Sequence, residues 1–260
     1  MSMPGPWELA LIFLIVLTRC SDNSAREKKL SSIVIEKEEW IKCPQNEWPQ
    51  ITMVNHIRYL DSEHHNAGCG FLLDIGADTI AVTAKHLLHF FKSNKMNSVS
   101  FNHSLVIWEM HPKNNMSDNV ILGEIINENP EESIEKIPVD KDWLLLRVKQ
   151  KSNNIVPLRF RESALVEGED VYIIGWRYSD NNCTQRIYEG NVVKSLGSSI
   201  LITTKALSDN KIPGLSGSPV IDAGGYLIGI MSQKYGKMER LSSTLYPKKF
   251  LANKINKKKI

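Results

Sequence analysis

Residues 214–220 read Gly-Leu-Ser-Gly-Ser-Pro-Val. A serine hydroxyl is a poor nucleophile until a base takes its proton and N–H donors hold the negative oxygen that forms. Gly214, two residues before Ser216, lets the backbone turn so that amide groups face that oxygen, and Gly217 keeps the approach open. The alternative is that the stretch is only a tight Gly/Ser turn leading into a strand, since such turns have the same composition. By itself, the stretch therefore makes Ser216 a candidate nucleophile.

A candidate base stands at the end of a β-type run of small residues. Residues 81–86 read Ala-Val-Thr-Ala-Lys-His, and imidazole is the usual general base near neutral pH. The small residues let a loop pack closely and aim the His86 ring. The chain has seven histidines, and we assign His64, His65 and His89 to surface or satisfied core positions.

A candidate orienting carboxylate precedes a fully apolar run. Residues 141–146 read Lys-Asp-Trp-Leu-Leu-Leu. A buried aspartate at the start of a strand can accept the imidazole N–H, fix its tautomer and stabilise the imidazolium. We choose Asp142 for this role. Asp140 is the rival, since it would point to the same face of an extended strand, and an ordinary turn aspartate is the alternative.

The chain order His86, Asp142, Ser216 discriminates between folds. An α/β-hydrolase needs its histidine after the serine, whereas the last histidine here is His111. Its Gly-x-Ser-x-Gly elbow also fails, because Ser218 occupies the place of the last glycine. A subtilisin-like order would place the aspartate before the histidine. Both alternatives are therefore excluded for this set of residues.

The pattern along the chain indicates an all-β protein. The 260 residues are 42% hydrophobic and 23% charged, as in ordinary globular proteins, which excludes wholesale disorder. Short apolar runs separated by Gly, Asn and Asp predict strands in a sandwich or barrel, with a helical turn near 86–91 and a C-terminal helix over 250–260. The runs lie at 70–73, 80–84, 105–108, 120–122, 143–148, 171–174, 190–193, 200–203, 218–221 and 226–230.

Together the motifs resemble those of the trypsin-like (chymotrypsin-fold) serine peptidases, particularly the bacterial members. Leu144 stands where the family usually has alanine. Leu215 replaces the acidic residue that in trypsin pairs with the freed N-terminus, so we expect no such activation switch. The resemblance spans about residues 45–247. The matching segments are Thr-Ala-Lys-His at 83–86, Asp-Trp-Leu-Leu-Leu at 142–146, Gly-Leu-Ser-Gly-Ser-Pro at 214–219, Gly-Cys-Gly-Phe at 68–71 and the strand at 225–230.

The resemblance implies two packed six-stranded antiparallel β-barrels and a short C-terminal helix. Residues 45–155 would form the first barrel, with His86 and Asp142, and residues 156–247 the second, with Ser216. Ser216 would be the nucleophile, His86 the general base and Asp142 the orienting carboxylate. The N–H groups of Gly214 and Ser216 would form the oxyanion hole.

The implied activity is hydrolysis of peptide bonds in a protein or peptide substrate through a Ser216 acyl-enzyme, with no cofactor and no metal. The first alternative is a catalytically silent protein of the same fold that binds a partner, with the turn at 211–213 holding Gly214 in the wrong orientation. An exported lipoprotein adhesin with accidental motifs is the second alternative. It requires three coincidences in the right order.

By the family pattern, the pocket for the residue before the scissile bond would be lined near Asn210, Lys211, Ser232 and Lys234. No acidic residue stands among them, which argues against a preference for Lys or Arg. Either lysine would favour an acidic side chain if it faced the pocket, and neither would contribute if it pointed to solvent, the usual position of lysine.

The N-terminal region indicates export. Residues 9–17 form an unbroken apolar run, too short to span a bilayer and of the length of a signal-peptide core. Residues 1–20 are therefore predicted to be a secretory or lipoprotein signal, followed by a polar linker over 21–44. Cys20, directly after the run, is a candidate for lipidation and membrane attachment. We expect a periplasmic, secreted or lipid-anchored protein.

The cysteines and the charges limit the partners. The four cysteines have no zinc-ligand spacing, and we expect Cys69, between two glycines, to be a free buried thiol. The formal charge is +3, but residues 248–260 hold six lysines and no acid, so the rest of the chain carries −3. The basic segment is a tail or helix at the C-terminus. We predict no nucleic-acid partner and a monomer.

Overall fold

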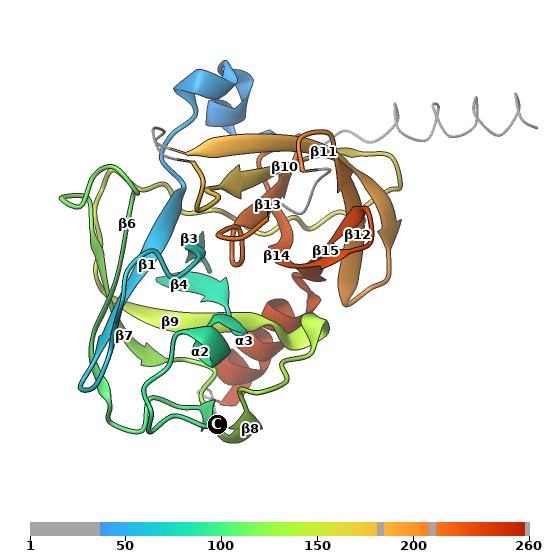
Figure 1. Ribbon diagram of the computed structural model, residues 1–260. Helices are drawn as coiled ribbons and strands as arrows, with labels where there is room; N and C mark the ends of the chain where they lie inside the picture. Colours follow the sequence, from blue (N-terminus) through green and yellow to red (C-terminus); the bar gives the residue numbers. More distant parts are fainter. Residues whose placement is uncertain (1–36, 181–184, 208–211, 258–260) are drawn as a thin grey trace, which may run out of the picture. The chain divides into compact units, whose positions relative to one another are not determined.

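Two β-barrels make up the computed structural model, which describes residues 37–180, 185–207 and 212–257 (Figure 1). Six strands of the first barrel follow the order β1-β3-β4-β9-β7-β6, and pairing of β1 with β6 closes it. The second barrel is closed in the order β10-β11-β12-β15-β14-β13. All these pairings are antiparallel, so the predicted all-β fold with two six-stranded barrels is confirmed. The predicted signal segment with Cys20, and also Cys183, Asn210 and Lys211, lie outside the described residues.

The strands have the following bounds. The first barrel contains β1 (Thr52–Tyr59), β3 (Cys69–Asp74), β4 (Thr79–Ala84), β6 (Leu105–His111), β7 (Val120–Ile125) and β9 (Trp143–Gln150), with β2 (Glu63–His64) added beside β1. A separate pair joins β5 (Ser98–Val99) and β8 (Asn129–Ser133). The second barrel contains β10 (Asp170–Gly175), β11 (Arg186–Ser195), β12 (Ser199–Thr204), β13 (Pro219–Asp222), β14 (Leu227–Tyr235) and β15 (Met238–Ser243).

The alternation of side chains explains why β4 is apolar along almost its whole length. Ala81 faces the core of the first barrel. Ile80 and Val82 point the other way, into a second cluster that includes Ile221 and Leu227 of the second barrel. A strand buried on both faces loses the polar alternation of a half-exposed strand. β4 therefore lies where the two barrels pack together.

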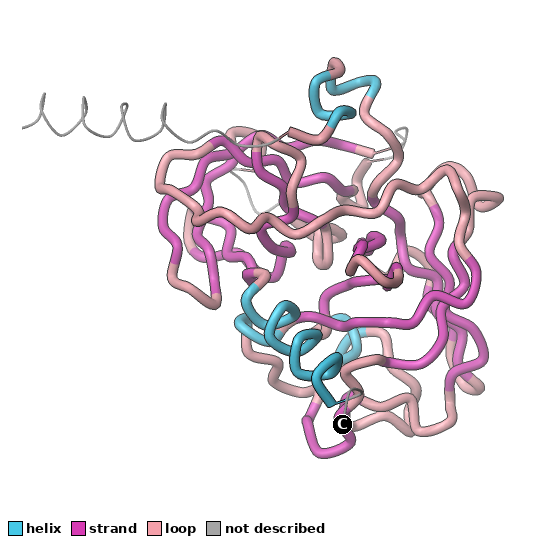
Figure 2. Tube along the Cα trace, turned by 180° about the vertical axis from the view of Figure 1, so that it is seen from behind, coloured by secondary structure: helices cyan, strands magenta, loops and turns pink. Residues whose placement is uncertain are grey.

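Two α-helices accompany the barrels in the described part of the chain. The single-turn α2 (Leu87–Phe90) follows β4, and α3 (Leu245–Lys257) follows β15. Seen from behind, α3 runs from the second barrel along the first (Figure 2). It begins five residues before the predicted start at residue 250, and Pro247 lies in its first turn, where proline is tolerated. None of the described helices is long and apolar enough to cross a bilayer.

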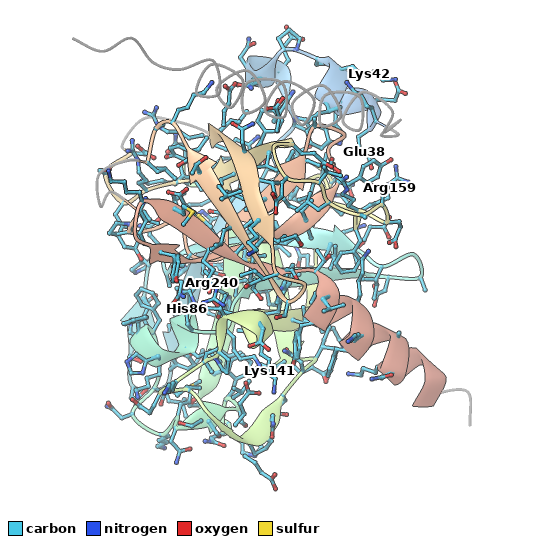
Figure 3. The ribbon with its side chains drawn as sticks, turned by 90° about the vertical axis from the view of Figure 1, so that its right-hand side faces the viewer. Glu38, Lys42, His86, Lys141, Arg159 and Arg240 are labelled. Carbon is cyan, nitrogen blue, oxygen red and sulfur yellow. The ribbon has the colours of Figure 1, made fainter. Side chains whose placement is uncertain are left out.

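Residues 37–44, the described part of the predicted polar linker, contact the second barrel. The Glu38 N–H donates to the Gly224 carbonyl at 2.8 Å, and the Glu38 carboxylate pairs with Arg159 at 2.7 Å (Figure 3). Trp40, in a 3-10 helix at Glu39–Lys42, packs against the cluster between the barrels. A second 3-10 helix follows at Gln45–Glu47.

Candidate active site

Strand register brings two of the predicted site residues together. Ala84 at the end of β4 pairs with Trp143 at the start of β9. His86 and Asp142 lie just beyond this pair, at the same end of two neighbouring strands. The Lys85 N–H donates to the Asp142 carbonyl at 3.2 Å and so continues the ladder to the site. His86 lies at the level where the two barrels meet (Figure 3).

The Asp142 carboxylate holds His86 through two hydrogen bonds. Its Oδ1 accepts the His86 backbone N–H at 2.8 Å, and its Oδ2 lies 2.7 Å from His86 Nδ1. The Ser232 hydroxyl donates to the same Oδ2 at 2.5 Å. The Asp142 side chain is 1% exposed, so these donors replace the water that a buried carboxylate would otherwise need. The imidazole is fixed in one orientation.

Ser216 reaches the other ring nitrogen from the second barrel. Its Oγ lies 2.9 Å from His86 Nε2. The peptide unit after the serine is held from both barrels, because the Ser216 carbonyl accepts the Cys69 N–H at 2.8 Å and the Gly217 N–H donates to the Met231 carbonyl at 2.9 Å. The structure thus brings His86, Asp142 and Ser216 into one hydrogen-bonded chain.

The backbone before Ser216 is oriented by its own hydrogen bonds. The Pro213 carbonyl accepts the Tyr178 N–H at 2.9 Å. Because a trans peptide unit is planar, its N–H points opposite to its carbonyl, so the Gly214 N–H is turned away from Tyr178. Neither that N–H nor the Ser216 N–H donates to another backbone group of the described residues. Gly214 has φ +106°, and a Cβ there would lie 2.7 Å from the Tyr178 nitrogen, which is why glycine is required.

The Cys69 thiol supports this loop from the first barrel. Its Sγ lies 3.2 Å from the Gly214 carbonyl oxygen. Burial raises the pKa of the thiol, so the thiol stays protonated and donates to that carbonyl. The expected free buried thiol at Cys69 is confirmed.

Leu215, the residue before Ser216, anchors the loop by apolar packing. Leu215 is fully buried in the core of the second barrel, together with Ile173 and Val220. Ser218 fits in the same region only because residue 175 is a glycine. A Cβ at that position would lie 2.1 Å from the Ser218 Oγ. The loop is therefore held by packing and by backbone hydrogen bonds.

The two predicted pocket residues that the structure describes, Ser232 and Lys234, have different partners. Ser232 faces Asp142, as described above, and sequence reasoning missed that contact. Lys234 Nζ is 2.7 Å from Glu239 Oε1 and donates to the Leu207 carbonyl at 2.9 Å. Its charge is therefore compensated by Glu239, whose side chain is 1% exposed. Asn210 and Lys211 lie outside the described residues.

A cavity of about 440 Å³ adjoins two of the three residues, His86 and Asp142. Its walls include His86, Asp142 and Ser232, so it opens directly beside the hydrogen-bonded chain. Phe90, 65% exposed, packs edge-on against His86 with ring centroids 6.3 Å apart. The remaining lining residues are His89, Ile134, Glu135, Lys136, Ile137, Val139 and Gln233.

In the described part of the chain, the side chains of the rival residues make no hydrogen bond to His86, Asp142 or Ser216. Asp140, in the turn Val139–Lys141, has no hydrogen-bond partner for its carboxylate among the described residues. His89 pairs with Glu135 at 3.3 Å. His64 packs against Phe91, with ring centroids 5.6 Å apart.

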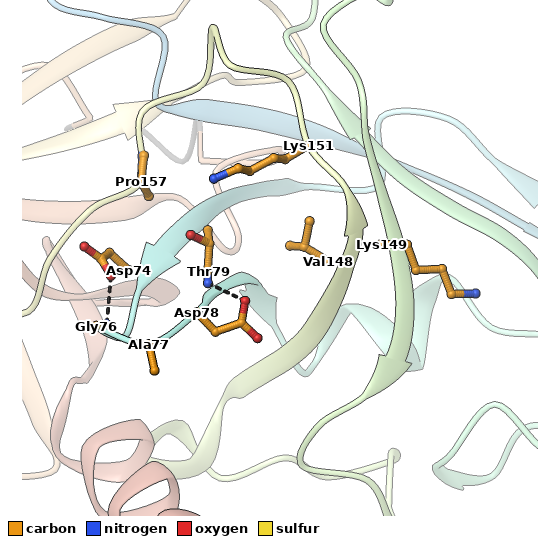
Figure 4. Close-up of a pocket in the computed structure, with 9 residues that line it drawn as sticks. All are labelled: Asp74, Gly76, Ala77, Asp78, Thr79, Val148, Lys149, Lys151 and Pro157. Carbon is orange, nitrogen blue, oxygen red and sulfur yellow. Dashed lines mark hydrogen bonds between the residues drawn. The ribbon is translucent and has the colours of Figure 1, made fainter.

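A second hollow, of about 620 Å³, lies on the first barrel and contains none of these residues (Figure 4). Two of its carboxylates accept hydrogen bonds from the adjacent backbone. Asp74 accepts the Gly76 N–H and Asp78 accepts the Thr79 N–H, both at 2.8 Å. These bonds shape the turn between β3 and β4. Of the two hollows, the one of about 440 Å³ is the one lined by His86 and Asp142.

The fold and the His86–Ser216 geometry define a class, the serine peptidases built on two β-barrels. The family model of the trypsin-like peptidase domain matches residues 68–230, which is more than half of the chain. The chain therefore belongs to this family. The predicted family resemblance is confirmed, and the protein is a serine peptidase of the trypsin-like family. No curated protein matches the sequence.

One solved structure supports the fold, and a second match is weaker. The active form of the Rv3671c protease from M. tuberculosis matches with a TM-score of 0.53 and 15% sequence identity, covering 84% of this chain and 87% of that one. The inactive Ser343Ala mutant of the same protease matches with a TM-score of 0.48 and 15% identity, covering 77% of this chain and 85% of that one. At this identity the likeness concerns the fold alone.

Proposed function

We propose that the protein is an endopeptidase that cleaves proteins or peptides through an acyl-enzyme on Ser216. The observation that carries the proposal is the unbroken chain Asp142–His86–Ser216, with contacts of 2.7 and 2.9 Å. This geometry matches what nucleophilic acyl transfer needs, namely a hydroxyl within reach of a base that a third group orients.

The proposed steps use these three residues and the backbone N–H groups of the loop that carries Ser216. Ser216 Oγ attacks the scissile carbonyl carbon while His86 Nε2 takes the hydroxyl proton. The N–H groups of Gly214 and Ser216 hold the resulting oxyanion. The protonated imidazole then gives its proton to the leaving amine, the C–N bond breaks and an ester remains on Ser216. Water hydrolyses that ester with His86 again as the base, which releases the carboxylic acid and the free serine.

The turn before Ser216 favours this function over the catalytically silent alternative. That alternative needs the Pro213–Gly214 peptide to point its carbonyl at the serine. The hydrogen bond from the Tyr178 N–H to Pro213 holds the carbonyl in the opposite direction. The cavity beside His86, with apolar side chains such as Phe90 and Ile137, supports a further element of the proposal, a substrate with an apolar residue near the scissile bond.

The setting of the activity belongs to the same proposal. The apolar run at residues 9–17 supports export, and Cys20 supports membrane attachment by lipidation. We further propose that the protein acts as a monomer, since the three residues come from one chain.

Labelling with a fluorophosphonate tests the proposal. We expect one adduct on Ser216 in the purified protein, found by intact mass and peptide mapping, and no adduct in Ser216→Ala or His86→Ala. Ser218→Ala is the matched control, because Ser218 belongs to the same loop but its hydroxyl is buried, and it keeps full labelling. A folded protein that takes up no reagent would instead be a binding module. An adduct that persists in Ser216→Ala would mean that the nucleophile is a different residue.

A further inference from the structure

A row of polar side chains crosses three strands on the outer face of the first barrel. His56 in β1 lies directly opposite Glu109 in β6. On the other side of β1, the antiparallel register with β2 pairs Ile57 with His64. One step further along this register, His65 lies opposite His56. The two imidazole rings stack with centroids 4.2 Å apart. Glu63, two residues before His65, lies on the same face because side chains alternate along a strand.

Three of these side chains converge on one point. His56 Nε2 is 2.9 Å from Glu63 Oε1, and His65 Nε2 is 3.8 Å from the same oxygen. One ligand atom from each of His56, Glu63 and His65 lies within 4.8 Å of the other two. Tetrahedral zinc, with bonds near 2.1 Å, needs ligand atoms about 3.4 Å apart. Small side-chain rotations therefore suffice to surround an ion.

An outer hydrogen bond orients the central imidazole. His56 Nδ1 lies 2.9 Å from Glu109 Oε1, and the other Glu109 oxygen accepts the Asn119 amide at 3.2 Å. The His56 side chain is 12% exposed and that of Glu109 is 16% exposed, so this arrangement is partly shielded from water. A carboxylate that fixes the far nitrogen of a ligating histidine is the usual outer partner at metal sites.

We propose that His56, Glu63 and His65 bind a divalent transition-metal ion of the zinc type. Two imidazoles and one carboxylate suit such ions, whereas calcium and magnesium prefer all-oxygen sites. The ion would lie between His56 Nε2 and the Glu63 carboxylate in place of their direct contact, with water completing its coordination. Binding would clamp the two-residue strand β2 onto β1. None of the three ligands belongs to the hydrogen-bonded chain at Ser216, so the proposal is independent of the proposed peptidase mechanism.

The spacing of these ligands along the chain is not a recognised metal motif, which is why the sequence predicted no metal. His56 and His65 are nine positions apart, and the β1–β2 hairpin brings them face to face. His64, between two of the ligands, points to the other face and packs on Phe91. It therefore provides a control at almost the same position in the chain.

The test is equilibrium dialysis and calorimetric titration of the full chain, without a histidine tag, against Zn²⁺ and Co²⁺. We expect one equivalent to bind, a rise in Tm on addition of Zn²⁺, and at least tenfold weaker binding in His65→Ala and in Glu63→Gln. Glu109→Gln weakens binding about tenfold, because the neutral amide that replaces the carboxylate is a weaker acceptor for the His56 Nδ1–H. His64→Ala keeps the affinity of the unchanged protein.

Three results would overturn the proposal. The first is no saturable metal uptake by the folded protein. The second is metal uptake by Glu63→Gln and His65→Ala that equals uptake by the unchanged protein. The third is loss of metal uptake in His86→Ala, which would place the ion at the candidate active site. Circular dichroism of each variant verifies its fold, and the exposed positions of Glu63 and His65 make folding of their variants expected. Fluorophosphonate labelling of the same samples keeps this test separate from that of the peptidase function.

Discussion

Asp142 and Asp140 are two residues apart, yet their carboxylates have different surroundings. The Asp142 carboxylate is buried and accepts hydrogen bonds from the His86 backbone, the His86 ring and Ser232. The Asp140 carboxylate is partly exposed and accepts none from the described residues. Only Asp142 can therefore hold the imidazole tautomer in which Nε2 is free to take the Ser216 proton.

We expect Asp142→Asn to lower kcat on a peptide substrate by a factor on the order of 10³–10⁴, because an amide favours the wrong imidazole tautomer. Asp140→Asn is the matched control and leaves kcat within about twofold of the unchanged protein. Steady-state kinetics of the two variants make the comparison. If Asp140→Asn were the damaging change, the orienting carboxylate would be assigned to the wrong residue.

His86, Asp142 and Ser216 could be picked out as candidates from the sequence because each lies in a local motif. Ser232 and Tyr178 are different cases. Ser232 reaches Asp142 from β14, 90 positions along the chain, and Tyr178 holds Pro213 from the loop after β10. Their neighbours in the sequence give no signal of these contacts. Only the closure of the second barrel, and its docking on the first, brings them to the site.

At the scale of elements, the loop after β10 is organised around Asp180. Its Oδ2 accepts the Arg177 backbone N–H at 2.9 Å and the Tyr188 hydroxyl at 2.8 Å. Burial would raise the pKa of Asp180, but hydrogen bonds from Arg177 and Tyr188 outweigh it and lower the pKa to about 2. Tyr178, whose N–H holds the Pro213 carbonyl, lies in the same loop.

This pKa has a consequence for stability. A carboxyl group with a folded-state pKa below its unfolded value stabilises the fold above the unfolded pKa, and that stabilisation is lost as the pH falls through the folded pKa. We expect Asp180→Asn to lower the free energy of unfolding at pH 7 by about 2 kcal/mol. Between about pH 4 and pH 2, the variant should lose less stability than the unchanged protein. Urea denaturation over this pH range is the measurement, and parallel curves for the two proteins would contradict the assignment.

The strands β14 and β15 are joined by the ion pair between the partly exposed Lys234 and the buried Glu239. Removing only the lysine leaves a carboxylate of 1% exposure without its cation. We expect Lys234→Met to lower the free energy of unfolding by about 3 kcal/mol, and the double change with Glu239→Gln to recover most of this loss. Chemical denaturation of the two single variants and the double variant gives the coupling. Additive losses would show that the pair contributes no net stability.

The same pair explains why β15 was absent from the predicted strands. Its sequence, Met-Glu-Arg-Leu-Ser-Ser, has no apolar run, because Glu239 is buried against a lysine and not against hydrocarbon. β1 was missed for a related reason, since His56 and Arg58 alternate with the inward-facing Ile57 and Tyr59. By contrast β4, buried on both faces, was predicted from its apolar run. The sequence therefore predicts strands best where a pleated face needs no polar partner.

At the scale of the whole molecule, the candidate site exists only where the barrels dock, and α3 crosses this junction. Tyr246 of α3 lies beneath Lys85, whose Nζ is 5.4 Å from the ring centroid and 2.8 Å from Glu132. The Tyr246 hydroxyl is also 3.5 Å from Asn127 Nδ2, which donates to the Trp143 carbonyl at 2.7 Å. Lys85 precedes His86 and Trp143 follows Asp142. One tyrosine of the C-terminal helix thus supports the chain beside both residues.

We therefore expect Tyr246→Ala to affect both stability and turnover. Loss of a half-buried aromatic ring costs about 2 kcal/mol, which lowers Tm by about 4–8 °C in a chain of this size. Turnover falls severalfold as well, because Lys85 and Asn127 lose a common support and the His86–Asp142 geometry loosens. Lys249→Ala, an exposed position on the same helix, is the control and changes neither quantity. Thermal unfolding and kcat are measured on the same samples. A lower Tm with unchanged kcat would mean that α3 only ties the barrels together, whereas a lower kcat at temperatures far below Tm would show that the helix positions the residues that we propose carry out the chemistry.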